Sequence, residues 1–289
     1  SGSATFSAND MGGANGSNTL NGTLSGSGSG SVTVTNNVAE TVTVAADATG
    51  DAEAVANVDD NVVFNPGAAA QLAFNVQPSD TATTVQISPA ITVEVQDALG
   101  NLVTSATDTV TLSIGTNPAS GTLSGTLARA AVTGVATFND ISIDKVGVGY
   151  TLNATAGGLT PAGSAAFAIT AGAATQLVFT VQPSNSAVGG IILGTPSVAV
   201  QDAGGNTVTG DNSTQITIAI KPGTGTSSAN LGGTLTLVVA NGVADFTNLS
   251  IDLAGSGYVL TGTATGLTSG DSSSFDVNSI LNLTQSDSS

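Results

Sequence analysis

The sequence QLAFNVQPS at residues 71–79 returns as QLVFTVQPS at residues 176–184, 105 positions later. VEVQDALGNLVT at 93–104 and VAVQDAGGNTVT at 198–209 are separated by the same 105 positions. GVATFNDISIDKVGVGYTL at 134–152 returns at 242–260 as GVADFTNLSIDLAGSGYVL, now 108 positions later. A period of this size predicts two copies of one module. We expect the three extra residues of the second copy in the loop at 223–232.

Within each copy, apolar residues alternate with polar ones, as in half-buried strands. This period of two is seen at Leu72, Phe74 and Val76, at Ile91, Val93 and Val95, at Val110, Leu112 and Ile114, and at Tyr150 and Leu152. Turn-forming residues separate these segments at 97–101, 117–118 and 147–149. About seven short strands in roughly 105 residues predict an immunoglobulin-like β-sandwich. Its largest core side chains would be Phe138, Tyr150 and their counterparts Phe246 and Tyr258.

Residues 1–66 match the later part of the same module. GTLSG at 22–26 recurs unchanged at 121–125. Counting outward from it aligns the following pairs: Ala4, Phe6 and Ala8 with Val110, Leu112 and Ile114; Val32 and Val34 with Ala136 and Phe138; Val42 and Val44 with Tyr150 and Leu152; Val62 and Phe64 with Phe167 and Ile169. The counterpart of residues 71–104 is missing. We therefore predict an incomplete module at 1–66, complete modules at 67–170 and 171–277, and a tail at 278–289.

The composition excludes several classes of function. The 289 residues include three Lys plus Arg against twenty Asp plus Glu, and no His, Cys or Trp. Without His and Cys, the commonest zinc sites and any His-based or thiol-based catalysis are excluded. Three cationic residues cannot form a nucleic-acid footprint, and no apolar run is long enough for membrane insertion. The net charge of −17 suits a surface that repels anionic membranes and polymers. We predict a protein that is not an enzyme and needs no cofactor.

VQDALGN, VQDAGGN, the GVATF and SIDKVGVGYTL segments, and NNVAETVTV at 36–44 resemble bacterial Ig-like domains of the invasin/intimin type. Such domains are repeated in tandem in large surface adhesins and other extracellular proteins. The resemblance implies a prokaryotic, extracellular or cell-surface location and structural or adhesive work. Its motifs form turns and cores, and none of them is catalytic. Residues 1–18 and 278–289 lie outside it.

Acidic residues at turns give two interpretations. Asp97 and Asp202, each followed four residues later by Asn, fit a hairpin turn in which Asp caps the turn. The alternative is a calcium site, since clustered oxygen ligands suit calcium. Asp59 and Asp60, near the first module junction, are a second calcium candidate that would stiffen a rod. The turn is the favoured interpretation.

The incomplete first module suggests a mechanism of assembly. A half sandwich without its first strands exposes unpaired backbone edges, which an added strand can cover. The tail supplies a candidate donor strand with Ile280, Leu281 and Leu283. We predict that it pairs head-to-tail with the incomplete module of another copy, near Phe6, Val32 and Val34, and so builds a filament or layer.

The alternative function is a rod segment of a large adhesin that binds a glycan or a host surface. An accessory module of a polysaccharide-degrading protein is the third candidate. It would need exposed aromatic side chains for sugar stacking, and aromatic residues make up only 3% of this chain.

Overall fold

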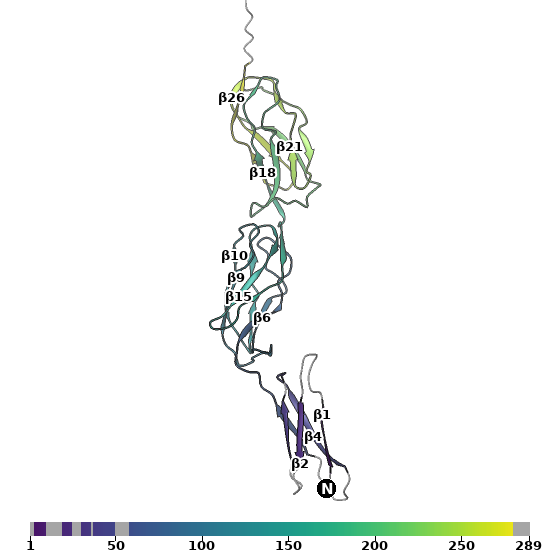
Figure 1. The fold of residues 1–289 in the computed structure, drawn as a ribbon. Coiled ribbons are helices and arrows are strands. Elements are labelled where there is room, and N and C mark those ends of the chain that lie inside the picture. Colours follow the sequence, from purple (N-terminus) through teal and green to yellow (C-terminus); the bar gives the residue numbers. More distant parts are fainter. Residues whose placement is uncertain (1–2, 10–18, 25–29, 36, 50–57, 280–289) are drawn as a thin grey trace, which may run out of the picture.

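Strands form all the regular secondary structure in the described residues, as expected for a chain rich in Val and Thr. The computed structural model describes residues 3–9, 19–24, 30–35, 37–49 and 58–279, with side chains at 37–41 and 63–279. We call its three parts the N-terminal unit (residues 3–66), the second unit (67–170) and the third unit (171–279). They follow one another along a rod (Figure 1). The predicted all-β fold of tandem Ig-like units is confirmed. No helix long and apolar enough to cross a membrane occurs in the part of the chain that is described.

The second unit is a sandwich of two main sheets with two smaller ones. One main sheet has the order β12-β8-β6, from β6 (Gln71–Val76), β8 (Ile91–Gln96) and β12 (Val135–Phe138). The other has the order β11-β9-β15-β16, from β9 (Thr109–Ile114), β11 (Ala128–Ala130), β15 (Leu152–Thr155) and β16 (Ala162–Gly163). The smaller sheets are β14-β17-β7, from β7 (Thr81–Ala82), β14 (Gly147–Tyr150) and β17 (Phe167–Thr170), and β10-β13, from β10 (Leu123–Ser124) and β13 (Ser142–Ile143).

The third unit repeats this topology strand for strand. Its main sheets are β18-β20-β24, from β18 (Ala174–Val181), β20 (Ser197–Asp202) and β24 (Val243–Asp245), and β23-β21-β27-β28, from β21 (Gln215–Ile220), β23 (Thr236–Val238), β27 (Leu260–Thr263) and β28 (Gly270–Asp271). The smaller sheets are β19-β29-β26, from β19 (Ser186–Ala187), β26 (Gly255–Tyr258) and β29 (Phe275–Asn278), and β22-β25, from β22 (Leu231–Gly232) and β25 (Ser250–Ile251).

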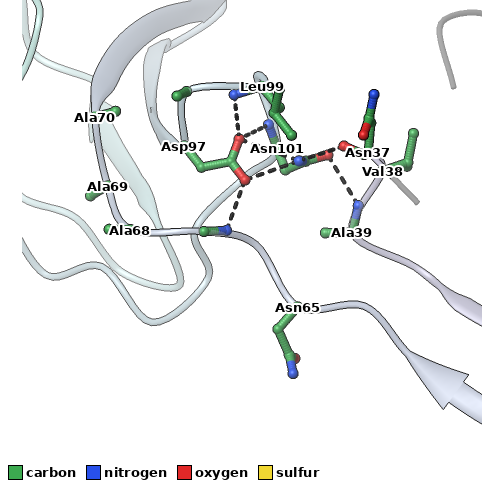
Figure 2. A pocket seen from close by; sticks show the side chains of 12 residues that line it. Asn37, Val38, Ala39, Asn65, Ala68, Ala69, Ala70, Asp97, Leu99 and Asn101 are labelled. Atoms are coloured by element: carbon green, nitrogen blue, oxygen red, sulfur yellow. Dashed lines mark hydrogen bonds between the residues drawn. The ribbon is translucent and has the colours of Figure 1, made fainter. Parts of the chain in front are cut away.

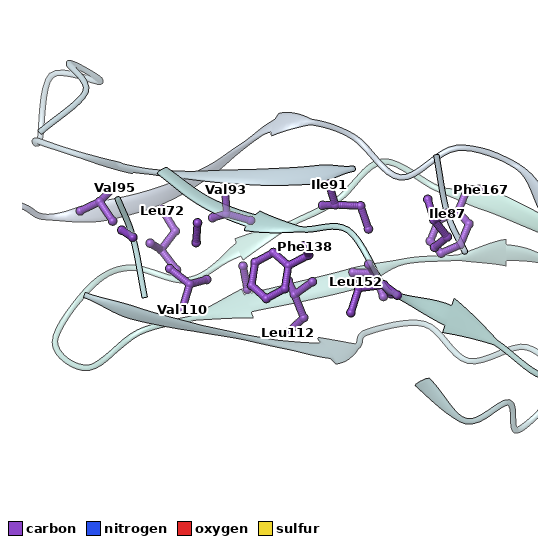
Figure 3. Packing of buried hydrophobic residues seen from close by; sticks show 14 of the residues in the cluster. Leu72, Ile87, Ile91, Val93, Val95, Val110, Leu112, Phe138, Leu152 and Phe167 are labelled. Atoms are coloured by element: carbon purple, nitrogen blue, oxygen red, sulfur yellow. The ribbon is translucent and has the colours of Figure 1, made fainter. Parts of the chain in front are cut away.

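Each of these two units has its own hydrophobic core. In the second unit, alternate residues of β8, namely Ile91, Val93 and Val95, are 0% exposed and face β9 and β15 across the sandwich (Figure 3). Phe138 and Tyr150 are also fully buried, and the same holds within 1% for Phe246 and Tyr258 in the third unit. The predicted large core residues are therefore confirmed. The two buried clusters share no residue, so each unit is closed on itself.

The N-terminal unit has five described strands, β1 (Ser3–Asn9), β2 (Thr19–Leu24), β3 (Gly30–Thr35), β4 (Thr41–Thr49) and β5 (Val58–Val63). They form a β1-β4-β5 sheet and a β2-β3 pair. Val42 pairs with Val62, as Tyr150 pairs with Phe167 in the second unit. The register thus agrees with the sequence alignment. One pairing differs: β3, the counterpart of β12, pairs with β2, whereas β12 pairs with β8.

Two local predictions need correction. Residues 147–149 were expected to form a turn, but they lie in β14, where Gly149 has a φ of 90° beside a register shift. The glycines therefore form a β-bulge within the strand and do not end it. The extra residues of the third unit do not all lie at 223–232 either. β21 starts 106 positions after β9 rather than 105, so one of the three residues lies before Gln215.

Candidate functional site: the junctions between units

The segment VQDALGN folds into a turn at the end of β8. The Asp97 carboxylate accepts hydrogen bonds through Oδ1 from the backbone N–H groups of Leu99 and Asn101, both at 2.9 Å. Gly100 N–H donates to the Asp97 carbonyl at 3.1 Å, and Gly100 has a φ of 88°, a conformation that favours glycine. The favoured interpretation of this motif as an Asp-capped turn is therefore what the structure contains.

The same carboxylate also binds the linker that enters the second unit. Asp97 Oδ2 accepts a hydrogen bond from Gly67 N–H at 2.8 Å and another from the Asn101 amide Nδ2 at 3.0 Å. Asp97 is only 3% exposed. The buried carboxylate thus joins the turn, the linker and the Asn101 side chain in one network.

Asn101 extends from this network to the N-terminal unit. Its Nδ2 donates to the Asn37 carbonyl at 3.0 Å, and its Oδ1 accepts from Ala39 N–H at 3.1 Å (Figure 2). We call this pair of bonds the Asn clamp: an amide side chain that binds a carbonyl and an N–H two residues apart. A hollow of about 440 Å³ lies beside it, lined mainly by alanines, Val38 and Leu99.

The second junction is built in the same way. Asp202 Oδ1 accepts from the N–H groups of Gly204 and Asn206 at 2.9 Å, and its Oδ2 accepts from linker Gly172 N–H at 3.0 Å. Asn206 Nδ2 donates to the Asp144 carbonyl at 3.1 Å, and Val146 N–H donates to Asn206 Oδ1 at 3.4 Å. Asn101 and Asn206 thus form the Asn clamp at both junctions through equivalent side-chain atoms, Nδ2 and Oδ1.

Two side chains of the second unit add contacts at the second junction. The Thr83 hydroxyl, 3% exposed, donates to Asp202 Oδ2 at 2.7 Å. Lys145 Nζ donates to the Gly204 carbonyl at 3.4 Å. Both bonds cross from one unit to the next, so the second junction holds more cross-unit bonds than are described at the first.

The hydrogen bonds lower the pKa of both aspartates. Burial raises the pKa of Asp97, but bonds from Asn101, Gly67 and Leu99 outweigh it and lower the pKa to about 2. Burial likewise raises the pKa of Asp202, and bonds from Thr83, Asn206 and Gly172 lower it to about 2. Both groups are therefore carboxylates at neutral pH, stabilised by the donors around them.

A buried tyrosine supports the loop of the second unit that the Asn clamp binds. We call such a loop, whose carbonyl and N–H groups bind the asparagine amide, the docking loop or docking side of a junction. The Tyr150 hydroxyl donates to the Lys145 carbonyl at 3.0 Å, between the two residues that the Asn clamp binds. Tyr258 donates to the Leu253 carbonyl at 2.9 Å in the third unit. Each tyrosine thereby fixes the loop before its strand from inside the core.

The calcium candidates are only partly described. Asp97 and Asp202 face N–H and O–H donors, which occupy the sides of the carboxylate that a cation would take. Asp59 and Asp60 lie in β5, where they pair with Ala45 and Val44; their side chains lie outside the described residues. No group of three or more acidic side chains that could hold a metal occurs within the described residues.

The assembly candidates are only partly described. Phe6 is in β1, opposite Ala46, and Val32 and Val34 are in β3, opposite Gly22 and Leu20. Only their backbones are described. Ile280, Leu281 and Leu283 lie outside the described residues, so strand donation stays a prediction.

Sequence reasoning found the turn but missed the junction. The docking groups are the carbonyls of Asn37 and Asp144 and the N–H groups of Ala39 and Val146. Almost every residue has such backbone groups, so the sequence does not indicate which of them form the contact. One signal was available: a glycine stands 30 positions before the aspartate in both copies, as Gly67 and Gly172.

Solved structures that are similar to this chain include proteins of bacteria. No protein-family model matches the sequence, and no curated protein matches it. Among solved structures, FdeC, an adhesin of Escherichia coli, is similar at 17% identity and a TM-score of 0.42, over 97% of this chain and 86% of that chain. Invasin, a bacterial integrin-binding protein, is similar at 15% identity and a TM-score of 0.34, over 96% of this chain and 53% of that chain.

The adhesin InvE of Yersinia pseudotuberculosis is similar at 15% identity and a TM-score of 0.30, over 72% of this chain and 58% of that chain. This chain therefore spans less than two thirds of the length of the invasin and InvE chains. The structural neighbours thus include two bacterial adhesins, FdeC and InvE.

Proposed function

We propose that this chain is a stalk segment of a prokaryotic cell-surface protein, which sets the spacing between the cell and a binding part. The observation that carries the proposal is the Asn clamp, formed at both junctions through equivalent side-chain atoms. A repeated junction of this kind gives successive units the same type of connection. Such a rod needs no catalytic group, in keeping with a chain that has no His and no Cys.

The strength of a junction supports a semi-rigid rod. Each neutral hydrogen bond contributes about 1 kcal/mol net, and one to a charged group about 1.5–3 kcal/mol. The bond from Thr83 to the Asp202 carboxylate belongs to the stronger class. Because linker, turn and docking loop share one buried network, bending the rod at this point would break several of these bonds together.

Small-angle X-ray scattering on the full chain tests the proposal. Asn101→Ala and Asn206→Ala together should remove both clamps, reduce the maximum dimension and add flexibility. Asn153→Ala, at an exposed position in β15, is the matched control. An unchanged scattering profile in the double variant, with both units still folded, would contradict the stalk.

The N-terminal unit favours a second candidate, a filament subunit joined by strand complementation. Its described strands include no counterpart of β6 and β8, and β3 pairs with β2 instead. A donated strand at this unit would restore the missing pairing. Electron microscopy should then show long particles for the full chain and none after deletion of residues 278–289. Monomers at high concentration of the full chain would exclude this assembly.

A further inference from the structure

The third unit has, at its far end, a loop equivalent to the one that docks at the second junction. Asp252 and Ala254 stand 108 positions after Asp144 and Val146, in the equivalent loop before β26. Tyr258 holds this loop through the Leu253 carbonyl at 2.9 Å, as Tyr150 holds its own loop at 3.0 Å. The two loops are therefore supported in the same way from their cores.

At this end the two docking groups have no partner among the described residues. Neither the Asp252 carbonyl nor the Ala254 N–H forms a hydrogen bond in the described part of the chain. Asp252 is exposed, and Leu253 between them is 39% exposed. At both internal junctions the equivalent carbonyl and N–H are bound by an asparagine amide.

We propose that this end binds the D-x-x-G-N turn of a further Ig-like module. The asparagine amide would donate to the Asp252 carbonyl and accept from Ala254 N–H. The inference rests on the Asn clamp of the proposed stalk, whose occupant at both known docking loops is such a turn. The occupant must have a vacant turn, because the turns at Asp97 and Asp202 are already engaged within this chain.

Differences among the three docking loops do not affect the bonds of the clamp. The residue between the two docking groups is Val38, Lys145 or Leu253, and the clamp binds backbone on either side of it. Val188 takes the place of Thr83 in the third unit by the 105-residue offset. The first junction forms its clamp with no described counterpart of that threonine, so the hydroxyl is not required.

A shortened chain, 67–289, provides the probe. Removing residues 1–66 frees the turn at Asp97 and Asn101, and the buried core of the second unit contains no residue from the part removed. The full chain, labelled with ¹⁵N, is titrated with unlabelled 67–289, whose fold is checked by circular dichroism. We expect the Ala254 amide signal to shift and its hydrogen exchange to slow several-fold, with a Kd of ~0.1–1 mM for so small a contact.

Asn101→Ala in the 67–289 probe should abolish the shift, and Asn153→Ala should leave it unchanged. In a second arm, another copy of residues 171–278 is fused directly after Asn278. The D-x-x-G-N turn of the added copy then lies next to the docking loop at Asp252 and Ala254 in the same polypeptide. Slow exchange at Ala254 is expected there, and Asn206→Ala in the added copy should restore fast exchange. Fast exchange at Ala254 in both arms would overturn the docking proposal. The stalk proposal is tested separately, by small-angle X-ray scattering of the Asn101 and Asn206 variants, so the failure of one proposal can be distinguished from the failure of the other.

Discussion

At the scale of single residues, Asn101 and Asn206 have a role that neither Asp nor Ala could fill. An amide side chain offers both a donor and an acceptor to the two backbone groups of the preceding unit, whereas an aspartate carboxylate only accepts and an alanine side chain does neither. Asp97 and Asp202 in turn hold each amide in place through Nδ2. Carboxylate and amide therefore act as a pair. The carboxylate binds the turn and the linker, and the amide binds the neighbouring unit.

Asn206→Asp should destabilise the third unit and its junction by ~1–3 kcal/mol. The change removes the donor to the Asp144 carbonyl and places a second negative charge beside the buried Asp202. Denaturant unfolding of the full chain measures the loss. Asn153→Asp, on an exposed face, adds the same charge and should have little effect. Equal losses in the two variants would contradict a specific role of the Asn206 amide.

The lowered pKa values of Asp97 and Asp202 predict acid sensitivity. Each pKa is about 2 in the folded chain against an ordinary value of 3.8, so the stabilisation is fully present above pH ~4 and is lost as the pH falls toward 2. It amounts to ~2 kcal/mol per carboxylate. Urea unfolding between pH 5 and pH ~2 should show the fall. Asp202→Asn should lower stability at pH 5 and reduce this pH dependence; an unchanged slope would contradict the assignment.

At the scale of elements, the alternation of apolar and polar residues predicted which residues form the cores. It did not predict the contacts between units at the junctions. The alternation of Ile91, Val93 and Val95 has a direct physical cause, since one face of β8 is buried. The bulge in β14 could not be predicted because its glycines are equally typical of a turn. The docking loops were missed because their contacts are made by backbone atoms, which every residue carries.

Tyr150→Phe tests how an element supports a junction. The ring stays in the core, where it is 0% exposed, and only the hydrogen bond to the Lys145 carbonyl is lost. We expect a loss of ~0.5–1.5 kcal/mol in unfolding free energy and faster hydrogen exchange at Val146, whose N–H binds Asn206. Tyr258→Phe is the matched control, because its loop is not at an internal junction. Faster exchange at Val146 in the control would contradict the local role of Tyr150.

At the scale of the whole molecule, the second and third units are two closed cores joined by polar contacts. The buried clusters of the second and third units share no residue. Among the described residues, cross-unit bonds such as that from Thr83 to Asp202 connect neighbouring units. The free energy of unfolding should therefore be the sum of the intrinsic stability of each unit and the stabilisation from each junction between neighbours, as in other repeat proteins.

Phe138→Ala and Phe246→Ala test this separation. Both side chains are buried to within 1%, and each substitution should destabilise its own unit by ~3–5 kcal/mol. Hydrogen exchange followed by mass spectrometry should show faster exchange in the strands of the substituted unit and near-normal exchange in the other. A loss of protection throughout both units in either variant would contradict independent cores.

The backbone character of the docking side has an evolutionary consequence. A loop that is recognised through its carbonyl and N–H groups can change its side chains without losing its neighbour, as the difference between Val38 and Lys145 illustrates. Gene duplication or recombination can then insert or delete whole repeats, and each new boundary inherits a working connector. Selection could in this way lengthen or shorten such a protein without redesigning any interface.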